Sequence, residues 1–532
     1  TSILQCRINQ QRFYMKKIIN FILSLLICSM VISCGSNEIM ELKEATVAEG
    51  ICKLFVEKKY EAAFTRMNES YRAGTTLEKF QSEIETYFSD VTEIKKNKME
   101  LIEENNSFYS ILCSLKTNSE DKYCNFIFSK GNFFPIEVNF LSEKPKITKT
   151  KNTKKDFPTV KSGDFDLTLA LGEDSLKDLC SDYFKLGCGL YGYNVETCSI
   201  NHKEYMEVAK KHFNSCTLTN LMKPVYVLNE RQSIQKYQNE KSEPVLTFEC
   251  IEDTLKWCKE NNVQMRGHTL VWHTQAPKWF FCQGYDSSND LVGREEMIER
   301  LDSFTKQYMG YVQDNFPGVV YCWDVVNEAV DPSKGDKNTN FMCRIVNDNQ
   351  ENYWYSTIGP DYPEVAFKIA RKYAADGVKL FYNDYGTVDK TKRNYIYNLC
   401  KDLKEKGLID GIGMQSYWDM KNPKLEDIKE AIELYASLDV EIQLTEWSMS
   451  AKEVSDKGFA EQAERYASIF RLLKQLDTQG GGNANITCVS FFGVMDGYTL
   501  YGNDTTNSRL FDKDLQPKPV FYSVSDTFKM FY

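Results

Sequence analysis

Two glutamates stand at the ends of short apolar runs that are typical of buried β-strands. Glu328 closes the run at residues 321–328, and Glu446 closes the run at residues 441–446. Burying an unpaired charge is costly, so a carboxyl group at the end of a buried strand does little for stability. Two such groups brought together are what glycoside hydrolysis requires, one as acid/base and the other as nucleophile or base. Ion pairs with basic residues would explain them equally well, so the surrounding residues must decide.

The elements that would position these glutamates alternate between strand and helix patterns from residue 164 onward. We predict strands at residues 186–191, 213–217, 264–272, 320–327, 379–383, 411–416, 441–445 and 487–493. Long helical patterns lie at residues 251–261, 294–315, 362–376, 391–406, 425–438 and 459–476. This order favours an α/β fold of the (β/α)8 TIM-barrel type, with a doubly wound open sheet as the alternative. A barrel would bring both glutamates to the face formed by the C-terminal strand ends.

Polar and aromatic residues accompany both candidate strands. His268 and His273, two of only four histidines, flank Trp272 at the end of one strand. No third ligand of suitable type lies nearby in the sequence, so we predict no metal and no cofactor. An indole and an imidazole at a barrel mouth suit a sugar, because the ring stacks on C–H faces and the imidazole bonds a hydroxyl. Asn327, beside Glu328, can hydrogen-bond a hydroxyl next to the reacting carbon.

Six motifs occur in a recognisable order along this part of the chain. They are RGHTLVWH, WDVVNEA, FYNDY, GIGMQS, LTEW and LFDKDLQPKP. Together they resemble glycoside hydrolase family 10, the β-1,4-xylanases, from about residue 167 to residue 528. The resemblance implies a retaining endo-hydrolase of β-1,4-xylan on a (β/α)8 barrel.

The resemblance also implies a role for individual residues. Glu328 would be the acid/base and Glu446 the nucleophile, with their carboxyl groups about 5–5.5 Å apart. We expect the charge of Glu446 to raise the pKa of Glu328, which must be protonated at rest. The positions expected to bind sugar are Asn220, Lys223, His268, Trp272, His273, Asn327, Gln415, Tyr417 and Phe492.

The sequence departs from the family pattern mainly around Glu446. The family usually has Glu at Thr219, His at Tyr417, Trp at Phe492 and a second Trp near Leu500, and Trp447 replaces a common Leu. We expect these changes to cluster around one pocket. They could alter the substrate preference, toward decorated xylan or a β-1,4-glucan, or leave a weak catalyst that mainly binds glycan. The intact glutamates favour activity.

Residues 1–36 have the features of an export signal. Two lysines follow Met15, an apolar run occupies residues 18–32, and the residues before Cys34 resemble the lipobox of bacterial lipoproteins. We therefore expect an exported protein, anchored at a bacterial membrane or cell surface through a lipid on Cys34. An uncleaved span is second choice, because the run is shorter than the ~20 residues that a spanning helix needs. An unmodified thiol is the other alternative.

Two further segments precede the predicted barrel at residues 164–532. Helical patterns followed by alternating strand patterns predict a small α+β domain at residues 37–140, whose opening resembles cystatin-like or NTF2-like modules. Residues 141–163 are lysine-rich and predict a solvated linker.

Charge and cysteine usage limit the partners. The net charge is −10, so we expect no nucleic-acid partner, and we expect a monomer. The seventeen cysteines show no disulfide framework, and we predict that Cys216, Cys322 and Cys488 are buried free thiols.

Overall fold

The computed structural model describes residues 43–104, 108–117, 121–129, 134–145, 158–237, 243–347, 350–497 and 507–529. Cys34 and Leu500 lie outside these residues. Within these ranges, no helix has the length and apolar character needed to cross a membrane.

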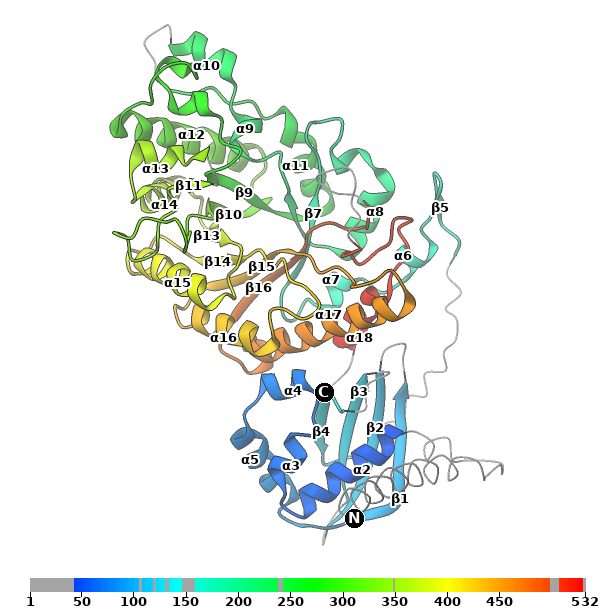
Figure 1. Ribbon diagram of the computed structural model, residues 1–532. Helices are drawn as coiled ribbons and strands as arrows, with labels where there is room; N and C mark the ends of the chain where they lie inside the picture. Colours follow the sequence, from blue (N-terminus) through cyan, green and yellow to red (C-terminus); the bar gives the residue numbers. More distant parts are fainter. Residues whose placement is uncertain are drawn as a thin grey trace, which may run out of the picture.

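The larger part of the chain is a closed barrel of eight parallel strands (Figure 1). Around the barrel the strands are β7 (Lys185–Leu190), β8 (Ser215–Leu218), β9 (Gln264–Trp272), β10 (Val320–Asn327), β13 (Lys379–Asp384), β14 (Gly411–Met414), β15 (Glu441–Trp447) and β16 (Asn485–Phe491). Strand β16 pairs with β7 and closes the ring, which confirms the predicted TIM barrel and rules out the open sheet.

Helices surround the barrel and bury their apolar faces against it (Figure 1). The main ones are α8 (Lys203–His212), α11 (Glu249–Asn261), α12 (Arg294–Asn315), α14 (Tyr362–Tyr373), α15 (Lys390–Glu405), α16 (Leu425–Ala436), α17 (Asp456–Leu476) and α18 (Pro519–Lys529). Shorter elements are β5 (Lys161–Ser162), β6 (Phe165–Asp166), α6 (Thr168–Gly172), α7 (Leu176–Leu179), η2 (Ser199–Asn201), α9 (Pro224–Val227), α10 (Glu230–Tyr237), η3 (Lys278–Phe281), η4 (Gln283–Tyr285), β11 (Val346–Asn347), β12 (Gln350–Glu351), α13 (Tyr353–Ile358) and η5 (Thr478–Gly480).

Local sequence explains where these helices begin. The side chain of Asp389 accepts hydrogen bonds from the backbone of Thr391 and Lys392 at the start of α15. Ser455 caps α17 in the same way through the backbone of Gly458. Such caps satisfy amide groups that have no partner inside the helix, and each stabilises the helix by about 1 kcal/mol.

Residues 43–141 form helices followed by an antiparallel sheet with its own core (Figure 1). The elements are α2 (Lys43–Val56), α3 (Tyr60–Phe64), α4 (Glu69–Gly74), α5 (Leu77–Phe88), β1 (Val91–Glu104), β2 (Phe108–Thr117), β3 (Lys122–Ser129) and β4 (Glu137–Leu141). The sheet order is β1-β2-β3-β4. Residues 65–68 separate α3 from α4, and β1 begins at Val91 in a polar stretch of the sequence.

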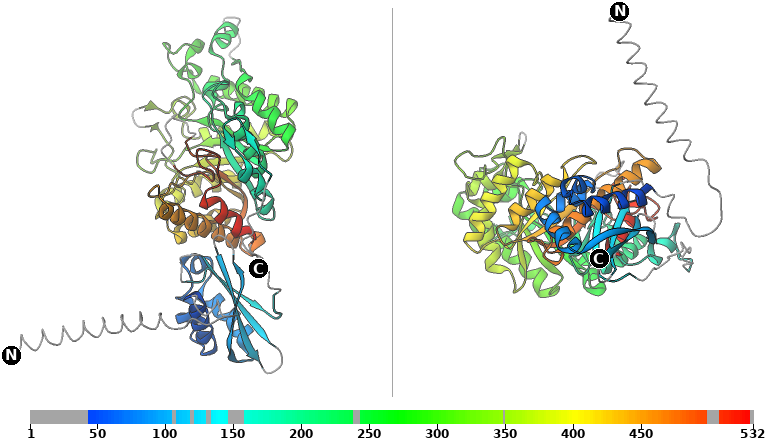
Figure 2. Two further views of the ribbon diagram at one scale, coloured as in Figure 1. Left: turned by 90° about the vertical axis from the view of Figure 1, so that its right-hand side faces the viewer. Right: turned by 90° about the horizontal axis from the view of Figure 1, so that it is seen from below.

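This small module packs directly on the barrel. Helix α4 lies against α16 and α17, and Ala73 joins the core of the barrel (Figure 2). Across the contact, Phe108 packs with Ala467, and the guanidinium of Arg471 lies 5.9 Å from the Phe108 ring centre. The end of the lysine-rich segment pairs with the start of the barrel, because β5 and β6 form a short hairpin.

The fourteen cysteines among the described residues are all free. The thiols of Cys216, Cys322 and Cys488 are buried, as the sequence predicted.

Candidate active site

Glu328 directly follows β10 at the mouth of the barrel, and its backbone is unusual. Its φ is 58°, in the left-handed region that residues other than glycine seldom adopt. The backbone nitrogen donates to Asn383 O over 2.9 Å, and Nε of Arg344 donates to Glu328 O over 2.8 Å. These bonds hold a costly conformation at the mouth of the barrel, as often occurs at functional sites.

Two donors bind the carboxyl group of Glu328, one on each oxygen. Nε2 of Gln415 lies 2.8 Å from Oε1, and the indole nitrogen of Trp272 lies 3.0 Å from Oε2. Trp272 ends β9 and Gln415 follows β14, so strands on both sides of β10 support this carboxyl group.

Glu446 lies near the end of β15 and is buried. Nδ2 of Asn383 donates to Oε1 over 3.0 Å, and the hydroxyl of Tyr417 donates to Oε2 over 2.6 Å. No basic side chain is bonded to either glutamate in the described part of the chain, so simple ion pairing does not account for them.

A network of amides links the two glutamates. Asn383 donates to both Glu446 and Asn327, and Gln415 lies between Asn327 and Glu328. Asn383 in turn accepts from the hydroxyl of Thr445 over 2.7 Å. The sequence analysis did not identify Asn383 as a site residue, although the motif FYNDY contains it at the end of a predicted strand.

The environment of Glu328 raises the pKa of its carboxyl group and so favours the protonated form. Burial is the largest cause of the raised pKa. The nearby charge of Asp384 raises it further, and the charge of Glu446 contributes least. The donors on Gln415 and Trp272 act in the opposite direction, because they favour the ionised form. The raised pKa agrees with the expectation, and the charge of Glu446 contributes to it as expected, but burial and the charge of Asp384 contribute more.

Lys223 and Asn220 meet Trp272 on one side of the cleft. Nζ of Lys223 donates to Gln275 over 2.8 Å and to Asn220 over 3.3 Å, and lies 4.6 Å from the Trp272 ring centre. Burial lowers the pKa of Lys223 to about 8, although both glutamate charges oppose the change. The structure therefore brings three of the predicted sugar-binding residues together.

His268 lies in the middle of β9, four residues before Trp272, and is buried. Its Nδ1 is 2.9 Å from Asp324, which also forms a two-pronged ion pair with Arg266. Burial opposes ionisation of Asp324, but Arg266 and His268 hold its pKa below the usual range. Because Nδ1 is engaged, only Nε2 of His268 can face a ligand. The ring of His273 lies beside Trp272, with 5.9 Å between the ring centres.

Two aromatic departures from the family pattern do lie at the site. The Phe492 ring packs edge-to-face on Tyr417, with ring centres 5.6 Å apart. Half of the Tyr417 side chain is exposed, but burial of its hydroxyl and the charge of Glu446 raise the pKa of Tyr417.

The expected clustering of all departures around one pocket was wrong. Trp447 is fully buried and packs on Tyr466, Phe470 and Phe491, because neighbouring residues of a strand point to opposite faces. Thr219 is also buried, and its hydroxyl donates to Leu190 O over 3.4 Å.

This arrangement supplies an acid and a nucleophile on opposite sides of one network. The described residues include no group of three or more histidine, cysteine or acidic side chains placed to hold a metal. A carboxyl group with a raised pKa and a second carboxyl group held by neutral donors lie beside an indole and a buried lysine. This combination suits the cleavage of an acetal in a sugar chain.

Comparisons with known proteins agree with this geometry. Residues 175–527 match the sequence pattern of glycosyl hydrolase family 10. A Caldicellulosiruptor saccharolyticus protein provisionally named an endo-1,4-β-xylanase is 43% identical over 289 residues, which are 53% of this chain and 89% of that protein. Endo-1,4-β-xylanase B of Butyrivibrio fibrisolvens is 36% identical over 354 residues, which are 66% of this chain and 52% of that protein.

A solved structure shows the same architecture. The Thermoanaerobacterium saccharolyticum xylanase, in a variant bound to xylotetraose, is 31% identical and superposes with a TM-score of 0.55. The match covers 66% of this chain and 99% of that one. The family pattern covers most of the barrel, and the chain therefore belongs to glycosyl hydrolase family 10.

Proposed function

We propose that this protein is an endo-1,4-β-xylanase that retains the anomeric configuration. The observation that carries the proposal is the pair Glu328 and Glu446, joined by an amide network at the mouth of a family 10 barrel. The xylotetraose complex of the T. saccharolyticum relative supports a xylo-oligosaccharide as the ligand.

The first step forms a covalent intermediate. A carboxylate oxygen of Glu446 attacks the anomeric carbon, while the glycosidic bond breaks and the proton of Glu328 moves to the leaving oxygen. The raised pKa of Glu328 favours the protonated form that donates this proton. Asn383 and Tyr417 hold the attacking carboxylate in position through its two oxygens.

The second step releases the sugar. Glu328, now ionised, removes a proton from water, the water oxygen bonds to the anomeric carbon, and the bond to Glu446 breaks. Gln415 and Trp272 stabilise the ionised form of Glu328 by hydrogen bonds, whereas burial and the charge of Asp384 favour its protonated form. The site therefore favours each of the two protonation states through different contacts. Two inversions give net retention.

Hydrolysis of defined oligosaccharides tests this function. We expect xylohexaose to be cut internally, with cellohexaose and mixed-linkage glucan cut much more slowly, and proton NMR to show the β-anomer first. Glu446→Ala should abolish turnover. A first product with the α-configuration would contradict retention. Binding of all three chains without cleavage would instead support the alternative, a catalytically weak glycan-binding protein, and preferred cleavage of cellohexaose would support a β-1,4-glucanase.

We also propose that Cys34 carries a lipid that anchors the protein at a bacterial membrane or cell surface. The support is the sequence alone, namely the basic start, the apolar run and the lipobox-like residues before the cysteine. Intact-mass measurement of protein extracted from membranes should show cleavage before Cys34 and a diacylglycerol adduct. Cleavage without the adduct would remove the proposal.

We further propose that residues 37–140 form one module, connected by residues 141–163 to a barrel of residues 164–532, and that the protein is a monomer. The separate apolar core supports the module, and a likeness to NTF2-like or cystatin-like modules rests on its opening sequence and on the order of helices and sheet. Light scattering would test the monomer, with a mass near 61.6 kDa expected for the full chain.

A further inference from the structure

Arg344 binds three successive backbone oxygens just after β10. Its Nε donates to Glu328 O over 2.8 Å, its backbone nitrogen to Ala329 O over 2.7 Å, and its Nη2 to Val330 O over 3.1 Å. Its Nη1 lies 3.3 Å from a carboxylate oxygen of Asp331. One buried residue therefore binds the whole segment in which Glu328 adopts its left-handed backbone conformation.

The same guanidinium connects Glu328 with the next strand of the barrel. Nη2 of Arg344 also donates to the hydroxyl of Tyr385 over 3.0 Å, and Tyr385 directly follows β13. The backbone nitrogen of Glu328 donates to Asn383 O of β13 over 2.9 Å. Both polar groups of the Glu328 backbone are therefore attached to the end of β13, one directly and the other through Arg344.

Hydrogen bonds also lead from Arg344 to the indole that binds the acid. Nδ2 of Asn352 donates to Arg344 O over 2.8 Å, and Oδ1 of Asn352 accepts from the backbone of Trp354 over 3.2 Å. The indole nitrogen of Trp354 donates to Trp272 O over 3.0 Å. The indole nitrogen of Trp272 in turn donates to Glu328 Oε2. These bonds close a ring of five residues that begins and ends at Glu328.

Three members of this ring are shielded from water. Arg344, Asn352 and Trp354 are buried, and the Trp354 indole packs edge-to-face on Phe281 with ring centres 4.7 Å apart. A buried donor that loses its acceptor has no water to replace it, so breaking such a bond is costly. The ring therefore resists a change of the Glu328 backbone from several directions at once.

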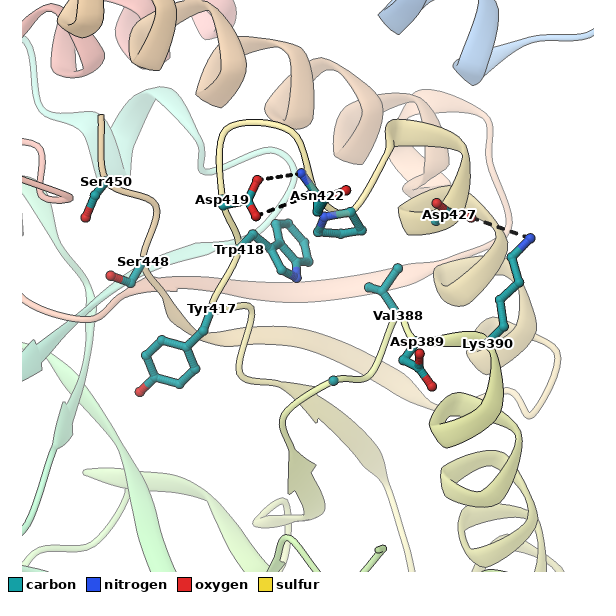
Figure 3. Close-up of a pocket in the computed structure, with 12 residues that line it drawn as sticks. Val388, Asp389, Lys390, Tyr417, Trp418, Asp419, Asn422, Asp427, Ser448 and Ser450 are labelled. Atoms are coloured by element: carbon teal, nitrogen blue, oxygen red, sulfur yellow. Dashed lines mark hydrogen bonds and ion pairs between the residues drawn. The ribbon is translucent and has the colours of Figure 1, made fainter. Parts of the chain in front are cut away.

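Glu446 is held in a different way. Its donor Tyr417 lies in the loop after β14, and half of the Tyr417 side chain is exposed. A pocket of about 680 Å³, lined also by Trp418 and Asp419, opens beside this loop, and the phenol of Tyr417 points away from the other lining side chains (Figure 3). In the described part of the chain, the contacts of Arg344 thus concern the acid rather than the nucleophile.

The acid needs a fixed position because it acts in both steps of the cycle. It gives a proton to the leaving oxygen and later takes one from water, and both transfers require hydrogen-bond distance. A left-handed backbone persists only where its surroundings hold it. An arginine suits this task, since its planar fork presents several donors in fixed directions, whereas the ammonium of lysine is a point charge on a flexible stem.

We propose that Arg344 is a positioning residue for the acid, which holds the backbone of Glu328 so that its carboxyl group stays against Gln415 and Trp272. Arg344 acts through Glu328 and not on the substrate. The effect on catalysis rests on the proposed xylanase function.

Two substrates with different leaving groups test that effect. In Arg344→Met we expect kcat/KM to fall about 10²-fold on xylohexaose, whose leaving oxygen needs the proton. On dinitrophenyl β-xylobioside, whose leaving group needs little proton donation, kcat/KM should fall by less than about fivefold. A role in folding alone would lower both values by the same factor, because it changes only the amount of active enzyme.

Two further variants separate position from charge and from stability. Arg344→Lys keeps the charge but loses the fork, so it should resemble Arg344→Met rather than the wild type. Arg300→Met is the matched control, because Arg300 on α12 is also buried and donates to Phe280 O over 2.8 Å and to Cys282 O over 2.9 Å. Its kcat/KM values on the two substrates should keep the wild-type ratio, whatever the change in Tm.

A measurement on the resting enzyme tests the contact without turnover. The indole N–H of Trp272 is bonded to Glu328, so its NMR signal, identified by its loss in Trp272→Phe, should exchange slowly with water. Arg344→Met should speed this exchange at least about tenfold, because the carboxyl group leaves the indole. Arg300→Met should leave the exchange as it is in the wild type.

Three results would overturn the proposal. They are equal losses on the two substrates in Arg344→Met, wild-type kcat/KM on xylohexaose in Arg344→Lys, and unchanged exchange at Trp272 in Arg344→Met. If Arg344→Met does not fold, Tyr385→Phe removes one acceptor of the guanidinium, and its loss on xylohexaose should exceed that on the aryl substrate by about threefold. Equal losses there would count against the proposal in the same way. A wild type that cleaves neither substrate would refute the proposed function, whereas the exchange at Trp272 would still show whether Arg344 holds the acid.

Discussion

Replacing Trp272 with phenylalanine should move the alkaline limit of activity to higher pH. The indole nitrogen is one of two donors on the Glu328 carboxyl group, at 3.0 Å from Oε2. Phenylalanine keeps an aromatic ring for sugar contact but removes the donor. Without it the ionised form of Glu328 is less stable, so the pKa of Glu328 rises and the acid stays protonated to higher pH.

The size of the shift follows from one hydrogen bond. A hydrogen bond to a charged group contributes about 1.5–3 kcal/mol. The lower value applies because Glu328, although mostly buried, is partly exposed, so water can replace the indole. One pH unit corresponds to about 1.36 kcal/mol, so the alkaline limb of kcat/KM should move up by about one unit.

The assay is the pH profile of kcat/KM on xylohexaose, a substrate with a poor leaving group, so that the alkaline limb reports the acid of the free enzyme. Trp257→Phe, on the outer helix α11, is the matched control and should leave the limb in place. An unchanged limb in Trp272→Phe would refute the view that this indole stabilises the ionised acid. A shift to lower pH would contradict the sign of the argument.

Three further predictions concern single residues. Glu328→Ala should lower kcat/KM for substrates with poor leaving groups by roughly 10²–10⁴-fold, and should slow the first step less for activated aryl glycosides. Equal slowing of that step for both kinds of substrate would contradict the role of Glu328 as the acid. Lys223 should lose its charge above about pH 8, so KM should rise there in the wild type but not in Lys223→Met, as steady-state kinetics would show. Burial raises the pKa of Glu137 to about 7, and Lys474 and Arg471 oppose this change. The native state therefore keeps a proton that the unfolded chain releases near pH 4.5, so the free energy of unfolding falls as pH rises from about 5 to 7. Glu137→Gln should flatten this fall, as thermal unfolding at several pH values would show.

The barrel could be predicted because each strand is a short apolar run and each helix has regular apolar spacing. These are properties of single elements, and the predicted strands differ from the observed ones mainly at their ends. The small module was harder, since β1 begins in the polar stretch at residues 91–98, where side-chain pattern gives little indication of a strand. Its pairing with β2, rather than its own sequence, forms the strand there.

The identity of a site residue could be predicted where a sequence motif contains it. Contacts that depend on how several strands of the barrel are arranged could not be predicted. Glu328, Glu446 and Gln415 lie at one end of the barrel because they end or directly follow the strands β10, β15 and β14, as the pattern indicated. The influence of Asp384 on Glu328 could not be read from the sequence, because it depends on how two strands align and on the depth of each carboxyl group. The same limit explains Trp447, which adjoins Glu446 in sequence but points into the core.

Tyr417 connects Glu446 with the loop that lines the neighbouring pocket. Its hydroxyl holds Glu446 at 2.6 Å, and the next residue, Trp418, forms a wall of the pocket beside the cleft. A phenol can donate to a carboxylate without taking up a proton near neutral pH, so it fixes the carboxylate without adding a titrating cation. Any change of the loop at residues 417–423 that moves the pocket wall would also move this donor. Substitutions that widen the pocket should therefore lower turnover on unbranched chains whenever they displace Tyr417, and spare it when they do not.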